Sequence, residues 1–392
     1  MVLLGFRYGV SPRTIQRCHG FKSVEAHICM KPFFSIIIPY HNSKDTIGPL
    51  LESIYSSKHA PPLEVIIVDD GSKELLQKTS FKRHFLLKLN ICILRLSVNK
   101  GPAVARNRGA EAAKGKFLVF LDSDVVLLPD ALSNLSKIYQ DDPDIMAVTG
   151  VWMKHQKTSR FFPNFKALRD WSYWINERDK SGYYYLFSTR IASIKRQVFN
   201  RLKGFDETYS APLVEDIEFT YRVARRYAII FAPTVRVRHE FEDFWPIAKK
   251  YFWRSYWWTK LYQGRKKFDP VATTLQEAVT ALSGIGVVGL GICFILFWSI
   301  TQIFNPPAGG QFSPSTTLGT GIFNKISIFN IQLVSIILYS LFILLIVHFF
   351  LIRKFLTFVY HEKGLVFSVK SFFVGLVLYC FIAAGAVWGR VH

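Results

Sequence analysis

Residues Phe117–Asp124, with the sequence FLVFLDSD, are the stretch that decides the fold class of this 392-residue chain. Five consecutive apolar residues predict a short strand buried on both faces, and Asp122-Ser123-Asp124 ends it. Three similar runs precede it, at Phe33–Pro39 (FFSIIIP), Leu63–Val68 (LEVIIV) and Ile91–Leu96. Strands of this type are typical of parallel sheets whose two faces are covered by helices.

The segments between these strands have helical patterns. They are Asp45–Ser57, Pro102–Lys114, which has proline at its first helical position, and Pro129–Tyr139. Alternating strands and helices predict an α/β domain with a mostly parallel, Rossmann-like sheet. Ligands of such sheets bind at the carboxyl ends of the strands. Those ends carry the polar groups Tyr40-His41-Asn42, Asp69-Asp70 and Asp122-Ser123-Asp124.

Charge is divided unevenly along the chain. The formal net charge is +21, yet residues 271–392 contain only 6 Lys/Arg and 2 Asp/Glu. The 61 aromatic residues exclude a disordered chain, because so much apolar surface cannot stay solvated. The five cysteines, spaced without any CxxC pair, argue against a disulfide scaffold or a zinc knuckle.

Three charge-free runs in the C-terminal part predict transmembrane helices near 279–303, 328–352 and 371–389. Arg265 and Lys266 precede the first helix, and Arg353 and Lys354 follow the second, whereas the connection at 304–325 holds a single lysine. The positive-inside rule therefore predicts a multi-pass protein of the cytoplasmic membrane, with the N-terminal domain and a loop at 353–370 facing the cytoplasm.

Two further segments are basic. Residues 1–32 form a basic leader without a signal-peptide core. Residues 244–268 contain 10 aromatic residues and 7 Lys/Arg but no acid. Such a segment favours an anionic lipid headgroup region, so we interpret it as an interfacial helix between the N-terminal α/β domain (33–243) and the transmembrane region (279–389). Nucleic acid, the other usual partner of basic aromatic segments, is not expected so close to a membrane span.

Each candidate site motif also has an ordinary structural explanation. Asp122 and Asp124 could bind one hard divalent cation, or simply form a turn. Asp69 and Asp70 could accept hydrogen bonds from a base or ribose, or cap a helix. The basic helix face after Gly101 could bind phosphate, and Glu215-Asp216 at a helix start could supply a general base.

The motifs taken together resemble the family 2 glycosyltransferases, which have a GT-A fold. The resemblance is carried, in order, by IIIPYHN (36–42), IIVDDGS (66–72), NKGPAVARN (99–107), FLVFLDSD (117–124), GFDE (204–207) and EDIEF (215–219). It extends from about Phe34 to about His239, roughly half of the chain. It implies an inverting transfer of a sugar from a nucleotide-sugar donor such as a UDP- or GDP-sugar.

The resemblance also implies roles for individual residues. Pro39, Tyr40, Asn42, Asp69 and Asp70 would hold the nucleoside, Arg106 and Asp122 would contact the donor, and Asp122 and Asp124 would place Mg²⁺ or Mn²⁺ on the diphosphate. His239 would be a further metal ligand or a structural histidine. Asp216, beside Glu215, would be the general base that deprotonates the acceptor.

Three functional interpretations stay open. The first is a single transfer onto a membrane-associated lipid or lipid-linked acceptor. The second is a processive polysaccharide synthase, although Phe252–Trp257 does not match the Gln-x-x-Arg-Trp signature of those enzymes. The third is a non-catalytic relative that binds nucleotide sugars. An enzyme is favoured because the acidic residues of all these motifs are present: Asp69, Asp70, Asp122, Asp124 and Asp216.

Overall fold

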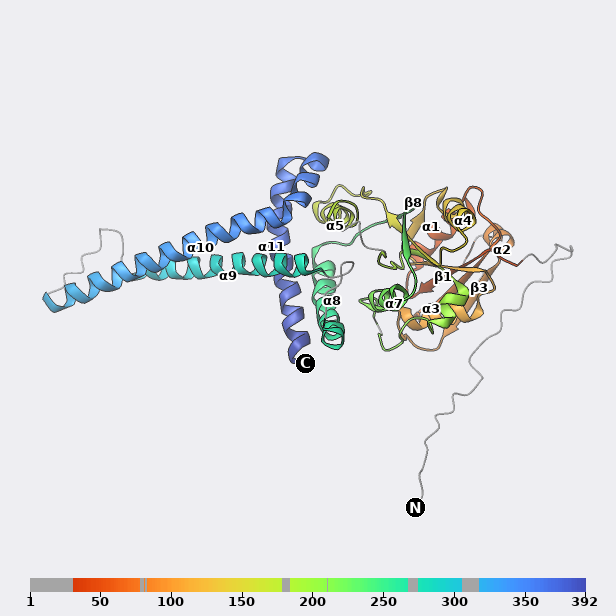
Figure 1. The fold of residues 1–392 in the computed structure, drawn as a ribbon, viewed down its shortest axis with the longest axis horizontal. Helices are drawn as coiled ribbons and strands as arrows, with labels where there is room; N and C mark the ends of the chain where they lie inside the picture. The colour runs from red at the N-terminus through yellow and green to blue at the C-terminus, as the bar shows by residue number, and fades with distance from the viewer. Residues whose placement is uncertain are drawn as a thin grey trace, which may run out of the picture. The chain divides into compact units, whose positions relative to one another are not determined.

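The structure is a computed structural model that describes residues 31–77, 81, 83–177, 184–209, 211–266, 274–304 and 317–392. Nearly all of the predicted basic leader therefore lies outside the described residues. The described residues form two compact units, one within 1–159 and 180–241 and the other within 160–179 and 242–392 (Figure 1). Residues 160–179, which the sequence places inside the catalytic domain, thus cluster with the C-terminal helices.

The first unit is built on an eight-stranded sheet with the order β3-β2-β1-β4-β7-β6-β8-β5. The strands are β1 (Phe34–Tyr40), β2 (Leu63–Asp70), β3 (Ile91–Leu96), β4 (Phe117–Leu121), β5 (Val125–Leu127), β6 (Ala147–Trp152), β7 (Ile191–Lys195) and β8 (Ile229–His239). Strands β3, β2, β1 and β4 are parallel, as predicted, whereas β7 is antiparallel to both β4 and β6. Strand β8 is parallel to β6, and β5 is antiparallel to β8.

The helices of this unit are α1 (Lys44–Tyr55), α2 (Arg83–Lys88), α3 (Pro102–Ala112), α4 (Ala131–Asp141), α6 (Arg196–Arg201) and α7 (Glu215–Ala224). All five residues of β4 are buried, so both faces of this strand are covered. Helix α3 packs closely on β1 and β2, because a Cβ at Gly109 would lie 2.5 Å from Ile37 Cγ2. This packing brings the N-terminus of α3 to the carboxyl ends of the strands.

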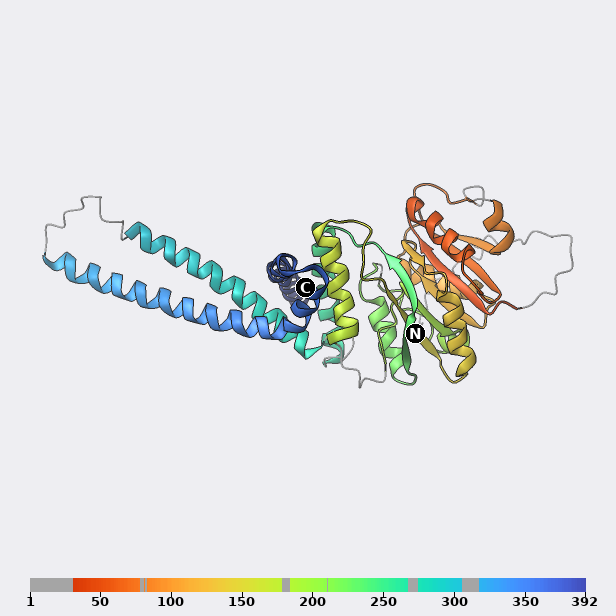
Figure 2. The ribbon, with the colours of Figure 1, turned by 90° about the horizontal axis from the view of Figure 1, so that it is seen from above.

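The second unit is helical. It contains α5 (Phe161–Ser172), a π-helical turn (Tyr173–Glu177), α8 (Phe244–Arg265), α9 (Leu275–Phe304), α10 (Thr317–Lys363) and α11 (Leu365–Val391). Among the described residues, three stretches are long and apolar enough to cross a membrane: Leu275–Ile300, Gln332–Lys363 and Leu365–Val391. Helices α9 and α10 run side by side in opposite directions (Figure 2).

The loop predicted at 353–370 is wrong, because α10 continues to Lys363 and only Gly364 separates it from α11. The helix continues because its apolar side chains are buried in a core: Phe355 and Val359 pack with Phe165 and Leu168 of α5. Gly364 has φ +81°, a left-handed conformation that favours glycine and makes the abrupt turn between the two helices possible.

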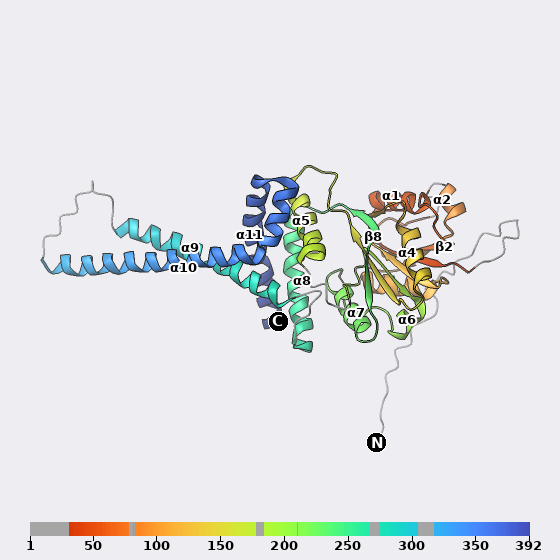
Figure 3. The ribbon, with the colours of Figure 1, turned by 45° about the horizontal axis from the view of Figure 1, so that its top comes forward.

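Helix α8 lies along α11 (Figure 3). A Cβ at Gly385 would lie 2.0 Å from the carbonyl oxygen of Phe252, and one at Gly389 would lie 2.6 Å from that of Tyr256. In the sequence, these glycines only lower the hydrophobicity of the third predicted span. In the structure they allow the backbones of two helices to approach closely, as small residues do between membrane helices.

Candidate active site

The ends of β1 and β2 form the first part of the candidate site. The ladder pairs Pro39 with Val68 and Tyr40 with Asp69, so the two predicted nucleoside motifs lie side by side. The backbone N–H of Asn42 donates to Ser72 Oγ at 2.9 Å. The structure therefore brings together the Tyr40-His41-Asn42 and Asp69-Asp70 segments, which are about 30 residues apart in the chain.

The two carboxylates at the end of β2 organise the loops around them. Asp69 is fully buried and accepts hydrogen bonds from the Ser72 backbone at 2.9 Å and from Arg95 of β3 at 2.6 Å. Asp70 accepts the backbone N–H groups of Lys100 and Gly101, both at 2.8 Å. Burial raises the pKa of Asp70 above its ordinary value, although these two hydrogen bonds oppose the shift. Asp70 thereby fixes the segment that leads into α3.

Arg106 of α3 joins the end of β4 to the start of α7. One terminal nitrogen donates to Asp122 Oδ1 at 2.7 Å and the other donates to Glu215 Oε1 at 2.8 Å. Arg106 is 2% exposed, and Glu215 is equally buried. Burial alone would lower the pKa of Arg106, but the charges of Asp122 and Glu215 outweigh it and raise the pKa. The predicted donor carboxylate and the predicted catalytic pair are thus linked through one buried guanidinium.

Asp124 and His239 meet where β5 pairs with β8. The ladder places His239 opposite Val125, and His239 Nε2 lies 3.4 Å from Asp124 Oδ2. Burial acts to raise the pKa of Asp124, but the hydrogen bond and charge of His239, together with the charge of Arg190, outweigh it and lower the pKa. The carboxylate is therefore held in its charged form.

This pair fits a divalent cation. Adjacent ligands of an octahedral ion with bonds of about 2.1 Å lie about 3 Å apart, close to the separation of these two atoms. Half of the Asp124 side chain is exposed, which leaves the pair open to further ligands. Within the described ranges, however, no three His, Cys, Asp or Glu side chains form a complete metal cluster. Asp122 instead gives one oxygen to Arg106.

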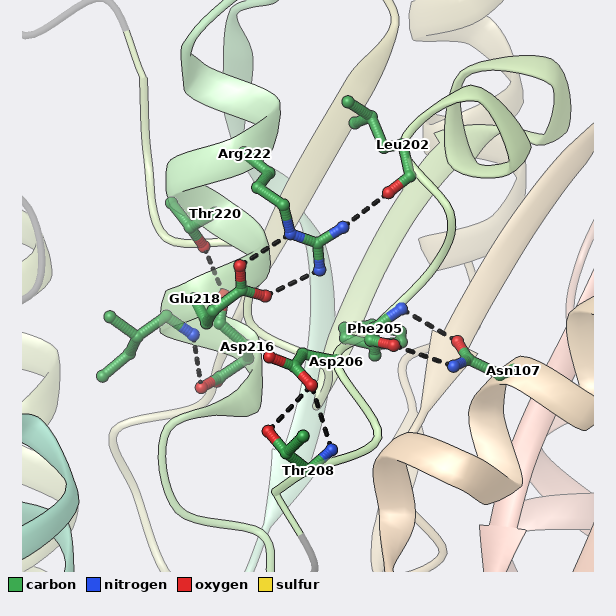
Figure 4. Close-up of polar contacts among 10 residues, drawn as sticks. Asn107, Leu202, Phe205, Asp206, Thr208, Asp216, Glu218, Thr220 and Arg222 are labelled. Atoms are coloured by element: carbon green, nitrogen blue, oxygen red, sulfur yellow. Dashed lines mark hydrogen bonds and ion pairs between the residues drawn. The ribbon is translucent and has the colours of Figure 1, made fainter. Parts of the chain in front are cut away.

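Asp216 lies in the first turn of α7 and is partly buried. Its Oδ1 accepts the backbone N–H of Ile217 at 2.9 Å, and its carbonyl accepts the Thr220 hydroxyl at 2.6 Å (Figure 4). On the same helix, Arg222 pairs with Glu218 at 2.6 Å and also donates to the carbonyl of Leu202. The bond to Leu202 ties the last turn of α7 to the end of α6.

Asn107 holds the loop that precedes α7. Its side chain donates to the Phe205 carbonyl at 2.9 Å and accepts the Phe205 N–H at 2.8 Å (Figure 4). Gly204 has φ +66°, and a Cβ there would lie 2.4 Å from Asn107 Oδ1. Because Asn107 directly follows Arg106, two successive residues of α3 hold Phe205 and Glu215.

Several residues of the site were not predicted from the sequence. Arg95 and Asn107 act on partners 26 and 98 residues away, and no local pattern indicates this. The position of Asn107 within NKGPAVARN was the available signal for that residue. Arg190, the residue before β7, belongs to no predicted motif, yet its charge acts on Asp124.

Residues 35–202 match the sequence profile described as Glycosyl transferase family 2. The chain contains a family 2 glycosyltransferase domain. This family 2 domain has the GT-A fold: the mannosyltransferase PcManGT from Pyrobaculum calidifontis, solved in complex with GDP-Man and Mn²⁺, aligns over 92% of this chain and 88% of its own, with a TM-score of 0.50 and 16% identity. That similarity concerns the fold alone.

Two relatives indicate the range of enzymes that share this domain. The UDP-Glc:alpha-D-GlcNAc-diphosphoundecaprenol beta-1,3-glucosyltransferase WfaP of Escherichia coli is 38% identical over 104 residues, which cover 26% of this chain and 38% of that protein. The glucosyl-dolichyl phosphate glucuronosyltransferase of Haloferax volcanii is 24% identical over 245 residues, 55% of this chain and 71% of that protein. The chain spans less than half the length of most curated relatives that it matches.

Proposed function

We propose that this protein transfers a sugar, with inversion, from a nucleotide-sugar donor such as a UDP- or GDP-sugar to a lipid or lipid-linked acceptor in the membrane. The single observation that carries the proposal is the buried Arg106, which joins Asp122 of the donor side to Glu215 of the catalytic pair. This triad holds the Asp122 motif and the Glu215-Asp216 motif together at the carboxyl end of β4, where donor and acceptor would have to meet.

The residues have distinct roles in the proposed reaction. The segments Pro39–Asn42 and Asp69-Asp70 hold the nucleoside. Asp124 and His239, with Asp122 close by in sequence, would bind Mg²⁺ or Mn²⁺, which would supply positive charge to the diphosphate. Asp216 accepts the proton of the acceptor hydroxyl as the acceptor oxygen attacks the anomeric carbon, and the bond from that carbon to the nucleoside diphosphate breaks. A single base on the face opposite the leaving group gives inversion.

The lipid acceptor is supported by two features. Three helices of the second unit are long and apolar enough to span a membrane. Two relatives are named for substrates on polyprenyl or dolichyl carriers. Lysine and arginine are concentrated before α9 and around the junction of α10 and α11. This distribution supports an arrangement in which the catalytic domain faces the cytoplasm.

The test is the substitution Asp216→Asn in the full-length protein. A panel of UDP- and GDP-sugars, measured by thermal shift with Mn²⁺, first identifies the donor, because a ligand at about 100 times its Kd stabilises the fold by about 2.7 kcal/mol. Asp216→Asn should keep this shift and lose transfer by at least about a hundredfold, because a general base contributes roughly 10²–10⁴ to the rate. Asp141→Asn, an exposed aspartate at the end of α4, is the matched control and should retain full activity.

Two outcomes would contradict the proposal. If no nucleotide sugar shifted the melting temperature with or without metal, the donor assignment would fail. If Asp216→Asn retained normal transfer, the assignment of the base would fail. The length of the product made on an isolated lipid acceptor separates a single transfer from a processive synthase.

A further inference from the structure

Arg190 lies at the rim of the candidate metal pair, on the antiparallel half of the sheet. The ladder between β4 and β7 pairs Leu121 with Ile191, so Asp122 and Arg190 are the next residues on the two strands. The charge of Arg190 acts on Asp124 from this position. The register thus places Arg190 next to Asp122 at the strand ends, and its charge reaches Asp124.

Two aromatic rings hold the guanidinium of Arg190. Its central carbon lies 4.7 Å from the centre of the Trp152 ring and 5.5 Å from the centre of the Phe241 ring. Trp152 is 2% exposed and belongs to β6, while the Phe241 ring packs edge-on against His239 at 4.6 Å. Cation–π contacts fix the plane of a guanidinium and leave the N–H groups at its edge available.

The guanidinium of Arg190 has donors that no described residue occupies. In the part of the chain that the structure describes, its guanidinium forms no hydrogen bond and no salt bridge, and the side chain is only partly buried. Arg106 is the opposite case, because both of its terminal nitrogens are bound to carboxylates and it is 2% exposed. Of these two arginines, Arg190 is the one that can offer a fork of donors to an incoming anion.

We infer that Arg190 is a phosphate-binding residue, which contacts a phosphate group of the donor diphosphate or of a phosphate-bearing lipid acceptor. The inference rests on the proposed function for the identity of the substrates. A planar guanidinium matches phosphate oxygens in a bidentate manner. Asp122, Asp124 and His239 beside it are the residues proposed to bind the metal on the same diphosphate. Arg190 thus takes the direct anion contact that the family resemblance implies for Arg106, and Arg106 positions the carboxylates.

The experiment compares Arg190→Gln and Arg190→Lys with the wild type as full-length proteins in detergent. Calorimetry measures the Kd of UDP, GDP and uridine, each with Mn²⁺ and with EDTA, and the Kd of undecaprenyl phosphate. Loss of a charge-assisted bidentate contact should weaken binding of a phosphate ligand about ten- to a hundredfold in Arg190→Gln. Arg190→Lys should fall between this variant and the wild type, because an ammonium lacks the fork. The matched control is Arg226→Gln, an exposed arginine beyond the far end of α7.

The two sources of phosphate give different results. A donor contact weakens UDP or GDP and leaves undecaprenyl phosphate unchanged, whereas an acceptor contact does the reverse. Uridine should bind Arg190→Gln as it binds the wild type in both cases.

Other outcomes would overturn the inference. Unchanged affinities for every phosphate ligand would do so, as would an equal loss for uridine and UDP, which indicates a collapsed pocket in place of a lost contact. If the wild type transfers sugar while Arg190→Gln binds all ligands normally, only the inference fails. If the wild type binds no nucleoside diphosphate and no polyprenyl phosphate, the inference and the proposed function both fail.

Discussion

Arg106 links two distant segments of the chain through its guanidinium group. It is buried between Asp122 and Glu215, which are 16 and 109 residues away in sequence. Its Nε and Glu215 Oε2 are buried without a hydrogen-bond partner among the described residues. An ion triad of this kind is stabilising only while all three groups are present, because removing one leaves buried charges unpaired.

Arg106→Met is therefore expected to destabilise the first unit by about 3–5 kcal/mol, which corresponds to roughly 10 °C in melting temperature for a unit of this size. Thermal melting of the full-length protein in detergent measures the change. Arg108→Met is the control on the same helix, because Arg108 is exposed and pairs mainly with Glu111. An exposed pair contributes at most about 1 kcal/mol, so a similar loss in both variants would contradict the special role of Arg106.

His239 and Asp124 are the pair that we propose as metal ligands. A chelator should abolish sugar transfer, and added Mn²⁺ or Mg²⁺ should restore it. His239→Gln removes the imidazole from the pair at 3.4 Å and should raise the Mn²⁺ concentration needed for half-maximal activity by about tenfold or more. Titration of activity and of bound Mn²⁺ by electron paramagnetic resonance measures both effects. An unchanged Mn²⁺ affinity would contradict the role of His239 as a metal ligand and would indicate a structural histidine.

Among the secondary-structure elements, α8 and α11 pack closely along each other. Helix α8 carries the basic and aromatic residues of the predicted interfacial segment, and its backbone approaches α11 at Gly385 and Gly389. Helix α11 also has Gly375, where an added Cβ would meet nothing within 4 Å. Glycines of one helix therefore have different functions, and the difference depends only on which side of α11 meets α8.

Gly385→Ala should destabilise the second unit, because its Cβ would lie 2.0 Å from the carbonyl oxygen of Phe252 and the two backbones would have to separate. Overpacking of this kind typically costs about 1–3 kcal/mol. Gly375→Ala is the matched control in the same helix and should be neutral or slightly stabilising, because alanine is the better helix former. Thermal melting in detergent distinguishes the two, and equal melting temperatures for both variants would contradict the packing of α8 against α11.

At the scale of the whole molecule, the chain combines a family 2 glycosyltransferase domain with helices long enough to cross a membrane. The distribution of lysine and arginine predicts that the catalytic domain is cytoplasmic and that the C-terminus is on the opposite side. This arrangement would place a nucleotide-sugar donor and a lipid acceptor on the same face of the membrane.

The topology can be tested with an epitope tag added after His392. In intact cells or right-side-out vesicles, an external protease should remove this tag while the N-terminal domain stays protected. The protein should also remain in the membrane fraction after a carbonate wash, because insertion of a spanning helix is effectively irreversible. Protection of the C-terminal tag together with the N-terminal domain would contradict the predicted number or orientation of spans.

The sequence by itself determined the fold class of the first unit, the parallel strands β1 to β4 and the apolar helices, because all of these depend on local periodicity and turn residues. It also placed Asp69, Asp70, Asp122 and Asp124 at strand ends. Only the tertiary structure decided how the charged groups are partnered. The sequence presents Arg106 and Arg190 as two arginines, but long-range contacts bury Arg106 between carboxylates and leave Arg190 stacked on rings, with no hydrogen bond or salt bridge to any described residue. Pairing and burial depend on residues distant in the chain, so no local pattern records them.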